Sequence, residues 1–251
     1  MSCVNIRGCC IGEGRPKVII PIVEPTETAI LKKAAEFSTL RADCVEWRID
    51  CFEGAKDLPA IVHCAAKLRV ALKDQLLLFT FRTKAEGGKV ALAHEEYLHF
   101  IRTVLATDCA DLIDIEFFTA DAELPALIEE AHTAGAAVVC SSHDFHKTPP
   151  RAELVSRMVA MQQSGADLPK LAVMPQSRAD VLELLAATAE MADRHPETPI
   201  ITMSMGALGA VSRLAGEAFG SAMTFANPGQ ASAPGQISLE VVNEVLDALH
   251  L

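Results

Sequence analysis

Short apolar runs alternate with segments of helical periodicity along almost the whole chain. From Lys17 onward eight such runs occur, and a helix-period stretch separates each run from the next. Alternating β and α signals favour a parallel sheet, and eight units in 251 residues match a closed (β/α)8 TIM barrel better than a doubly wound sheet. We expect the strands at residues 18–23, 44–50, 76–82, 112–118, 137–143, 169–174, 200–205 and 222–226.

The two ends of the chain depart from this repeating pattern. Residues 3–14 contain two short strand-like pieces around Arg7 and Gly8, which predicts an N-terminal β-hairpin that closes one end of the barrel. Residues 239–249 have the pattern of a final amphipathic helix. No linker-like stretch, low-complexity tract or charge run divides the chain, so we expect a single domain over residues 1–251.

Charge and hydropathy exclude several classes of partner. The formal net charge of −11 argues against nucleic acid, because phosphate binding needs a basic surface. No signal-peptide pattern is present and no apolar run reaches the ~20 residues that span a bilayer, so we expect a cytoplasmic protein without a membrane partner. The eight cysteines lack CxxC spacing, and Cys9 and Cys10 are adjacent, so we expect all of them to be reduced thiols.

In several expected strands one face is apolar and the other is charged. In 44–50, for example, Val45, Trp47 and Ile49 share the apolar face. The apolar faces must pack against the helices, so the charged faces point into the barrel. The charged residues expected in the lumen are Glu46, Arg48, Asp50, Arg82, Asp114, Glu116, His143 and Lys170. Buried charges are costly unless paired, so we interpret the lumen as a pocket for a small, hydroxyl-rich, anionic molecule.

Lys170 and His143 are the candidate reactive groups of this pocket. Residues 151–163 predict a crossover helix, which makes the strands that contain His143 and Lys170 neighbours in the sheet. Burial disfavours the charged ammonium, and a neutral lysine amine is a nucleophile. A lone lysine in an apolar run also often extends to solvent or pairs with a carboxylate, so a structural role stays open.

The last third of the chain supplies different groups to the same lumen. Met203 and Phe225 point inward by alternation and could wall one side of a ring-sized ligand, although such residues are more often core. Arg213 is expected on the first turns of a helix whose amino end faces the pocket, which suits a carboxylate. The Gly- and Pro-rich segment 227–240 has the composition of a lid with Ser232 and Gln236 as polar groups, or of a plain connecting loop.

Seven segments spread over nearly the whole chain carry a family resemblance: EWRID (46–50), FTFRTKAEGG (79–88), SSHDFHKTP (141–149), ADLPKLAVMPQ (166–176), ITMSMG (201–206), SRLAGEAFGS (212–221) and ASAPGQIS (231–238). Together they resemble the type I 3-dehydroquinate dehydratases of the shikimate pathway. The resemblance implies a (β/α)8 barrel, conversion of 3-dehydroquinate to 3-dehydroshikimate and water, no metal or organic cofactor, and a homodimer.

The resemblance also implies a role for each site residue. Lys170 would form an imine (Schiff base) with the C3 ketone, His143 would remove the C2 proton and then protonate the departing C1 hydroxyl, and Glu86 would hold His143. The implied substrate contacts are Glu46, Arg48 and Arg82 to the ring hydroxyls, Arg213 and Gln236 to the carboxylate, and Ser232 in the closing loop. Pro21 stands where many members have serine, and segments 206–209 and 227–230 also differ from the family's pattern.

Three other functions are weighed against this one. A class I aldolase would also place an imine-forming lysine in a late strand of a barrel. A metal-dependent hydrolase could use His143, Asp144 and His146, but neighbouring positions at a strand end point to opposite faces. A non-catalytic binding barrel would be expected to have lost at least one of Glu86, His143 and Lys170, and all three are present.

Overall fold

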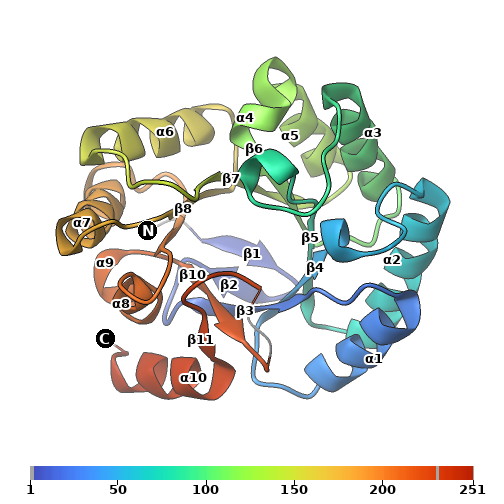
Figure 1. The fold of residues 1–251 in the computed structure, drawn as a ribbon, viewed down its shortest axis with the longest axis horizontal. Helices are drawn as coiled ribbons and strands as arrows, with labels where there is room; N and C mark the ends of the chain where they lie inside the picture. The colour runs from blue at the N-terminus through green and yellow to red at the C-terminus, as the bar shows by residue number, and fades with distance from the viewer. Residues whose placement is uncertain (1–2, 230–231, 251) are drawn as a thin grey trace.

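The computed structural model, which describes residues 3–229 and 232–250, has eight parallel strands arranged as a closed barrel (Figure 1). The strands are β3 (Lys17–Ile22), β4 (Cys44–Arg48), β5 (Leu76–Thr80), β6 (Leu112–Glu116), β7 (Ala137–Asp144), β8 (Leu168–Val173), β9 (Ile201–Ser204) and β10 (Met223–Asn227). From β3 to β9 each strand pairs in parallel with the next along the chain, and β10 pairs in parallel with β3. An isolated parallel bridge between Ile200 and Ser221, which directly precede β9 and β10, links these two strands. The barrel predicted from the sequence is confirmed.

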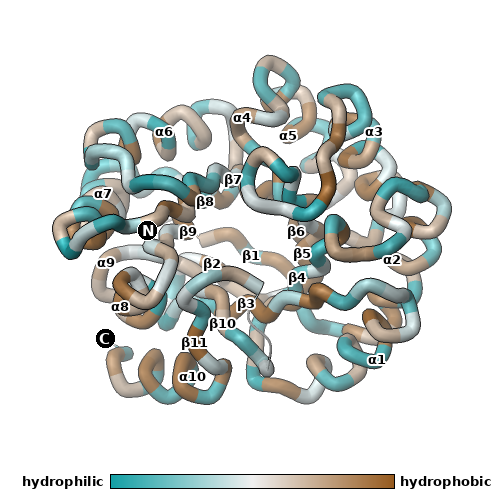
Figure 2. Tube along the Cα trace, in the orientation of Figure 1, coloured by the Kyte–Doolittle hydropathy of each residue, from teal (hydrophilic) through white to brown (hydrophobic). Residues whose placement is uncertain are grey.

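Helices surround the strands and shield their outer faces (Figure 1). The longer ones are α1 (Glu27–Phe37), α2 (Leu58–Leu72), α3 (His94–Leu105), α5 (Leu124–Thr133), α6 (Arg151–Gln163), α7 (Arg178–Arg194) and α10 (Leu239–Ala248). Their polar and apolar residues alternate along the trace, as expected for helices with one face in the core (Figure 2). Thr26, Ser177 and Ser238 cap α1, α7 and α10 by accepting a backbone N–H of the first turn.

Three shorter helices and a short edge strand complete the chain around the barrel mouth. They are α4 (Phe117–Ala120), α8 (Ala210–Leu214), α9 (Gly216–Phe219) and β11 (Ile237–Ser238), which pairs with β10. The expected strand 112–118 ends at Glu116, because Phe117 begins α4. None of the described helices is long and apolar enough to cross a membrane. The single domain, the cytoplasmic location and the homodimer stay predictions.

The strands separate two apolar clusters. The larger cluster lies between the outer strand faces and the helices and includes Ile20, Trp47 and Phe79. The smaller one lies inside the barrel: Ile19 and Leu168 fill it at the amino ends of the strands, and Met203 and Phe225 extend it to the cavity. The barrel therefore has an apolar floor, and the charged lumen residues lie above it, toward the carboxyl ends of the strands.

The N-terminal hairpin, formed by β1 (Val4–Ile6) and β2 (Cys9–Ile11), lies across the barrel behind the strand ends (Figure 1). Its two turn residues, Arg7 and Gly8, both have positive φ, as a tight hairpin turn requires. Ile11 is fully buried and packs into the apolar floor. The side chain of Asp111 fixes the hairpin, because it accepts hydrogen bonds from Arg7, from Arg69 of α2 and from the backbone of Leu77. The predicted closing hairpin is thus present.

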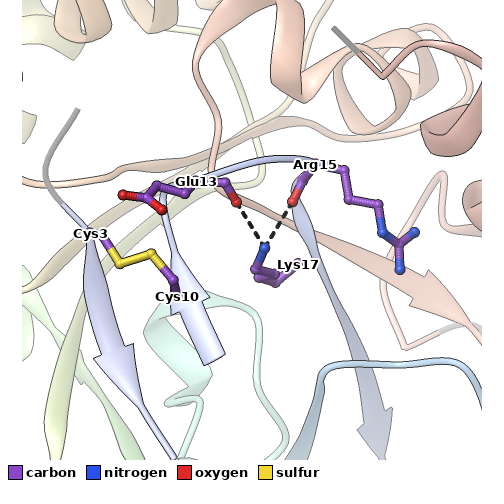
Figure 3. The surroundings of a disulfide bond; sticks show 5 residues. All are labelled: Cys3, Cys10, Glu13, Arg15 and Lys17. Carbon is purple, nitrogen blue, oxygen red and sulfur yellow. Dashed lines mark hydrogen bonds between the residues drawn. A yellow bond between two sulfur atoms is a disulfide. The ribbon is translucent and has the colours of Figure 1, made fainter. Parts of the chain in front are cut away.

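Cys3 and Cys10 form a disulfide in this hairpin, so the prediction that all eight cysteines are reduced thiols is wrong for these two (Figure 3). Cys10 lies opposite Asn5 in the register, which puts it on the same face as Cys3, and the two Cα atoms are 5.7 Å apart. This pair has neither CxxC spacing nor adjacent positions, and only the register of the hairpin brings the two cysteines together. The other six cysteines are free.

Candidate functional site

A cavity of about 200 Å³ opens at the carboxyl ends of the strands. The predicted site residues that line it come from β4, β5 and its loop, β7, β8, β9, α8, β10 and the loop before β11. They are Glu46, Arg48, Arg82, Glu86, His143, Lys170, Met203, Arg213, Phe225, Ser232 and Gln236. The structure therefore brings together every side chain that the sequence assigned to one site.

Lys170 lies inside the barrel and has a carboxylate partner. Its side chain is 4% exposed, and its Nζ donates a hydrogen bond to Asp114 Oδ2 at 3.0 Å. The nitrogen also lies over the ring of Phe225, 4.8 Å from the ring centre. Pairing with a carboxylate is one of the possibilities that the sequence leaves open for this lysine, and the partner in the structure is Asp114, to which the sequence assigned no role.

Asp114 connects Lys170 to Arg82. Its Oδ1 accepts from Arg82 Nη2 at 2.8 Å and from the Ser141 hydroxyl at 2.6 Å. Burial opposes the charged carboxylate, but the positive charges of Arg82 and Lys170 outweigh burial and hold the pKa of Asp114 below its ordinary value. Arg82 Nη1 also donates to Glu116 Oε1 at 2.8 Å. Both terminal nitrogens of Arg82 are therefore used by the protein, and its implied contact with a ring hydroxyl stays a prediction.

His143 and Glu86 form a second pair in the cavity. The Nδ1 of His143 lies 2.8 Å from Glu86 Oε2, and the same oxygen accepts the backbone N–H of His143 at 3.0 Å. Glu86 Oε2 already accepts the backbone N–H, so it acts as an acceptor. A His143 Nδ1 that carries a proton and donates it therefore suits this oxygen better than an unprotonated Nδ1. This arrangement favours the histidine tautomer with a free lone pair on Nε2, the form that a general base needs.

Burial acts on both members of this pair. It lowers the pKa of His143 well below the ordinary 6.5, and the positive charges of Arg82, Lys170 and Arg48 lower it further. It raises the pKa of Glu86 to about 8, with Glu116 and Asp114 adding to the effect and Arg82 opposing it. At neutral pH the imidazole is therefore uncharged and able to accept a proton.

Arg213 is a buried guanidinium without an anionic partner among the described residues. It is 1% exposed, its Nη2 donates to the Pro234 carbonyl at 3.2 Å, and its buried Nε has no hydrogen-bond partner. Burial lowers its pKa to about 10. The sequence predicts Arg213 on the first turns of a helix, but the helix that contains it, α8, is only five residues long, with Arg213 in its last turn. In this region an anion would therefore be bound by the side chain of Arg213 and not by the amino end of a helix.

Glu46 and Arg48 present polar atoms on the opposite wall from α8. Glu46 is 3% exposed, and its Oε1 accepts from the Thr80 hydroxyl at 2.9 Å. Arg48 donates from Nε and Nη2 to the two oxygens of Asp50 at 2.8 and 2.9 Å. Among the described residues, the second carboxylate oxygen of Glu46 and Nη1 of Arg48 take no part in these hydrogen bonds, and both side chains line the cavity. Pro21 lies opposite Glu46 in the sheet and offers no hydrogen-bond donor.

Ser232 and Gln236 belong to the loop that covers the cavity from the β10 side. Gln236 Nε2 donates to the Ser232 hydroxyl at 2.9 Å, and Ser232 N donates to Gln236 Oε1 at 2.7 Å. The loop rests on the segment after β9, where Gly206 N donates to the Pro234 carbonyl at 3.2 Å. A side chain at Gly235 would lie 2.2 Å from Gly206 O, so glycine is required there. Residues 230 and 231, which end the predicted segment 227–230 and begin 231–238, lie outside the described residues.

The comparisons with known proteins identify the family. Residues 18–251 match the model of type I 3-dehydroquinase. The chain belongs to this family. It is 48% identical to the 3-dehydroquinate dehydratase of Bacillus subtilis, over 100% of this chain and 98% of that protein. The enzyme of Bacillus licheniformis is 47% identical over 98% of this chain and 97% of its own length. The solved type I enzyme of Clostridium difficile is 44% identical, with a TM-score of 0.96 over 99% of this chain and 98% of that one.

Sequence reasoning located Asp114 and Glu116 in the lumen of this type I 3-dehydroquinase barrel but gave neither a role. Their alternation with apolar residues along the strand is what placed them in the lumen. Only the shift of each strand along its neighbours shows that Asp114, and not Glu116, reaches Lys170.

The metal-hydrolase alternative gains no support, because Asp144 Oδ1 accepts the backbone N–H of His146 and of Lys147. Within residues 3–229 and 232–250, the one group of three potential metal ligands is Cys3, Cys10 and Glu13, far from this site and containing the disulfide.

We expect the stability contributed by Glu86 to depend on pH. Its pKa is about 8 in the folded protein against an ordinary 4.5. Between these values the folded state holds a proton that the unfolded state has lost, so stability falls as pH rises. The free energy of unfolding of the parent protein should therefore fall relative to Glu86→Gln by a few kcal/mol between pH 5 and pH 8 and level off above pH 9.

Urea unfolding of both proteins at each pH measures this difference. Glu129→Gln, a change on the exposed face of α5, is the matched control and should show no such trend. A difference between the parent and Glu86→Gln that is constant across this range would show that the Glu86 carboxyl titrates normally.

Proposed function

We propose that the protein is a 3-dehydroquinate dehydratase, a hydro-lyase that converts 3-dehydroquinate to 3-dehydroshikimate and water through an imine on Lys170. The observation that carries the proposal is the shared cavity of three groups: the lysine amine, the Glu86–His143 pair and the unpaired guanidinium of Arg213. Membership of the type I family supports it. No described feature favours the aldolase or the non-catalytic binding barrel.

Substrate binding follows from the unsatisfied groups of the cavity. Arg213 takes the carboxylate, because a buried guanidinium without an anionic partner among the described residues is stabilised most by a bidentate anion. Gln236 and Ser232 add hydrogen bonds from the covering loop, and the free polar atoms of Glu46 and Arg48 contact ring hydroxyls. Met203 and Phe225 form an apolar wall of the cavity, with the Phe225 ring against the Lys170 nitrogen, which keeps water away from the reacting carbon.

Imine formation uses the lone pair of Lys170. Its nitrogen, once it has released a proton, attacks the C3 carbonyl carbon. The carbonyl oxygen takes up two protons in the course of the addition and leaves as water. The product is an iminium, in which the positive nitrogen withdraws electrons from the C2–H bond. No metal or organic cofactor is needed for this activation.

Elimination uses His143 twice. Its free Nε2 removes the C2 proton, and the C–H electron pair forms the C2=C3 bond of an enamine while the C=N pair returns to nitrogen. The enamine then re-forms the iminium and expels the C1 hydroxyl, which takes the proton from His143 and leaves as water. Hydrolysis of the iminium releases the product and the free amine. The low pKa of His143 leaves it in the basic form before the first transfer.

A solved relative gives a further indication of covalent chemistry. The type I enzyme of Clostridium difficile was solved with covalently modified comenic acid. That observation concerns the relative, and it supports the proposal that a ligand carbonyl can be attacked in a cavity of this architecture.

Lys170 should be the single point of covalent attachment. Incubation with 3-dehydroquinate and borohydride should reduce the iminium to a stable secondary amine, and mass spectrometry should find one adduct on the peptide containing Lys170. Trapped protein should melt at a higher temperature, because the ligand is attached in the folded state. Lys170→Ala should lose both the adduct and the ultraviolet signal of the conjugated product, while circular dichroism shows a folded barrel. An adduct on another lysine, or turnover by Lys170→Ala at a comparable rate, would contradict the mechanism.

His143 should be required for elimination and dispensable for imine formation. His143→Ala still has Lys170, so borohydride should trap the adduct, while kcat falls by roughly two to four orders of magnitude. His146→Ala is the matched control in the same loop region and should keep its activity. Loss of activity in His146→Ala that added metal restores would favour the hydrolase alternative instead.

Arg213 should determine the affinity for the carboxylate. Arg213→Ala should raise KM at least tenfold, as removal of a charge-assisted pair of about 1.5–3 kcal/mol predicts. Arg213→Lys should recover part of the loss, because the charge is restored without the bidentate geometry. Arg194→Ala, an exposed arginine at the end of α7, is the control. An unchanged KM in Arg213→Ala would place the carboxylate at Arg48 or Arg82.

A further inference from the structure

The nitrogen of Lys170 lies between a carboxylate and an aromatic ring. Asp114 Oδ2 is 3.0 Å away, and the centre of the Phe225 ring is 4.8 Å away on another side. β6, β8 and β10, which supply these three residues, are alternate strands of the barrel. Alternate strands contribute the side chains of one layer of a barrel core, so this contact is set by the architecture and not by a flexible loop.

Asp114 is held so that it accepts hydrogen bonds on both oxygens. Oδ2 accepts from Lys170, and Oδ1 accepts from Arg82 at 2.8 Å and from Ser141 at 2.6 Å. The side chain is fully buried, and each of these donors favours the ionised carboxylate. A carboxylate in this setting is a stable negative charge and a poor proton acceptor.

The positive charges that line the cavity would destabilise a positive nitrogen at Lys170 unless a negative charge lies beside it. Arg48, Arg82 and Arg213 all line the cavity and repel a positive nitrogen. The other buried carboxyl groups of the barrel lumen have different hydrogen-bond donors: Thr80 for Glu46, His143 for Glu86, and Arg82 and Thr83 for Glu116. His143 carries no charge at neutral pH, because burial lowers its pKa.

We propose that Asp114 is the counter-ion of the Lys170 nitrogen and that its carboxylate, which stays ionised throughout, keeps the iminium protonated while the C2 proton is removed. This inference rests on the proposed function. An iminium withdraws electrons strongly only while its nitrogen is positive, and loss of the N–H proton gives a neutral imine that activates the C2–H bond poorly. Asp114 exchanges no atom with the substrate, and the proton acceptor in the cycle remains His143.

Asp114→Asn tests the proposal by removing the negative charge at constant size. Without the counter-ion the iminium should lose its proton at lower pH, so the alkaline limb of kcat should move down by about one to three pH units. The value of kcat at the optimum should fall more than tenfold. Glu116→Gln is the matched control, since Glu116 is equally buried and also binds Arg82 but does not contact Lys170. Its alkaline limb should stay in place even where its activity is reduced.

The outcomes separate this inference from the proposed function. If the parent protein gives no borohydride adduct at Lys170, the imine mechanism fails. If the parent gives the adduct and Asp114→Asn has the parent's alkaline limb, the imine mechanism stands and the counter-ion assignment is overturned. A shift of equal size in Glu116→Gln would also overturn it, because the effect would then come from Arg82.

A second measurement needs no variant, and it applies even if Asp114→Asn does not fold. Infrared difference spectra of the parent protein, with and without the equilibrium mixture of substrate and product, report whether a carboxylate becomes protonated as the imine forms. Labelling the aspartate carboxyl carbons with ¹³C identifies aspartate bands. We expect no protonated aspartate band to appear, and a labelled band that does appear would overturn the assignment.

Discussion

The guanidinium of Arg82 is the interaction on which the charged half of the barrel depends. It binds Asp114 and Glu116 at 2.8 Å and lies 3.5 Å from Glu86. Asp114 in turn holds Lys170, and Glu86 holds His143, so both reactive side chains are positioned through carboxylates that share one cation. Removing one partner of a buried ion pair leaves the other uncompensated, typically at a cost of about 3–5 kcal/mol. Loss of Arg82 would therefore disturb stability and both halves of the site together.

The cost of burying these charges is limited to one end of the barrel. At the amino ends of the strands the lumen is filled by aliphatic side chains and sealed by Ile11 of the hairpin. Several of the charged side chains above this floor, among them Glu46, Asp114 and Lys170, rise from rigid strands, which holds them more tightly than loops would. The apolar floor and the helices outside provide the stability, and the upper layer is free to serve chemistry.

The two-residue period of the strands allowed the fold and most of the site to be predicted, since it assigned each side chain to the lumen or to the helix side. It could not predict contacts across the lumen, because these depend on how far each strand is shifted along its neighbours. The pairing of Lys170 with Asp114 is such a contact. The Cys3–Cys10 disulfide was missed for the same reason, since it depends on hairpin register. Glu86 lies in a loop, where no period applies, and only the family resemblance identified it.

The region of Arg213 shows how tertiary contacts override a local helical pattern. The sequence predicts a helix with Arg213 on its first turns, but the structure contains two short helices here, α8 and α9. The carbonyl of Arg213, which would bond within a longer helix, instead accepts the hydroxyl of Thr224 from β10 at 2.9 Å. This contact ties the backbone of Arg213 to the barrel strand that also provides Phe225. In the proposed binding mode the carboxylate partner and the ring that faces the Lys170 nitrogen therefore move as one unit. The barrel therefore sets the distance between the group that binds the carboxylate and the group that reacts with the ketone. This holds although the guanidinium comes from a short helix outside the barrel.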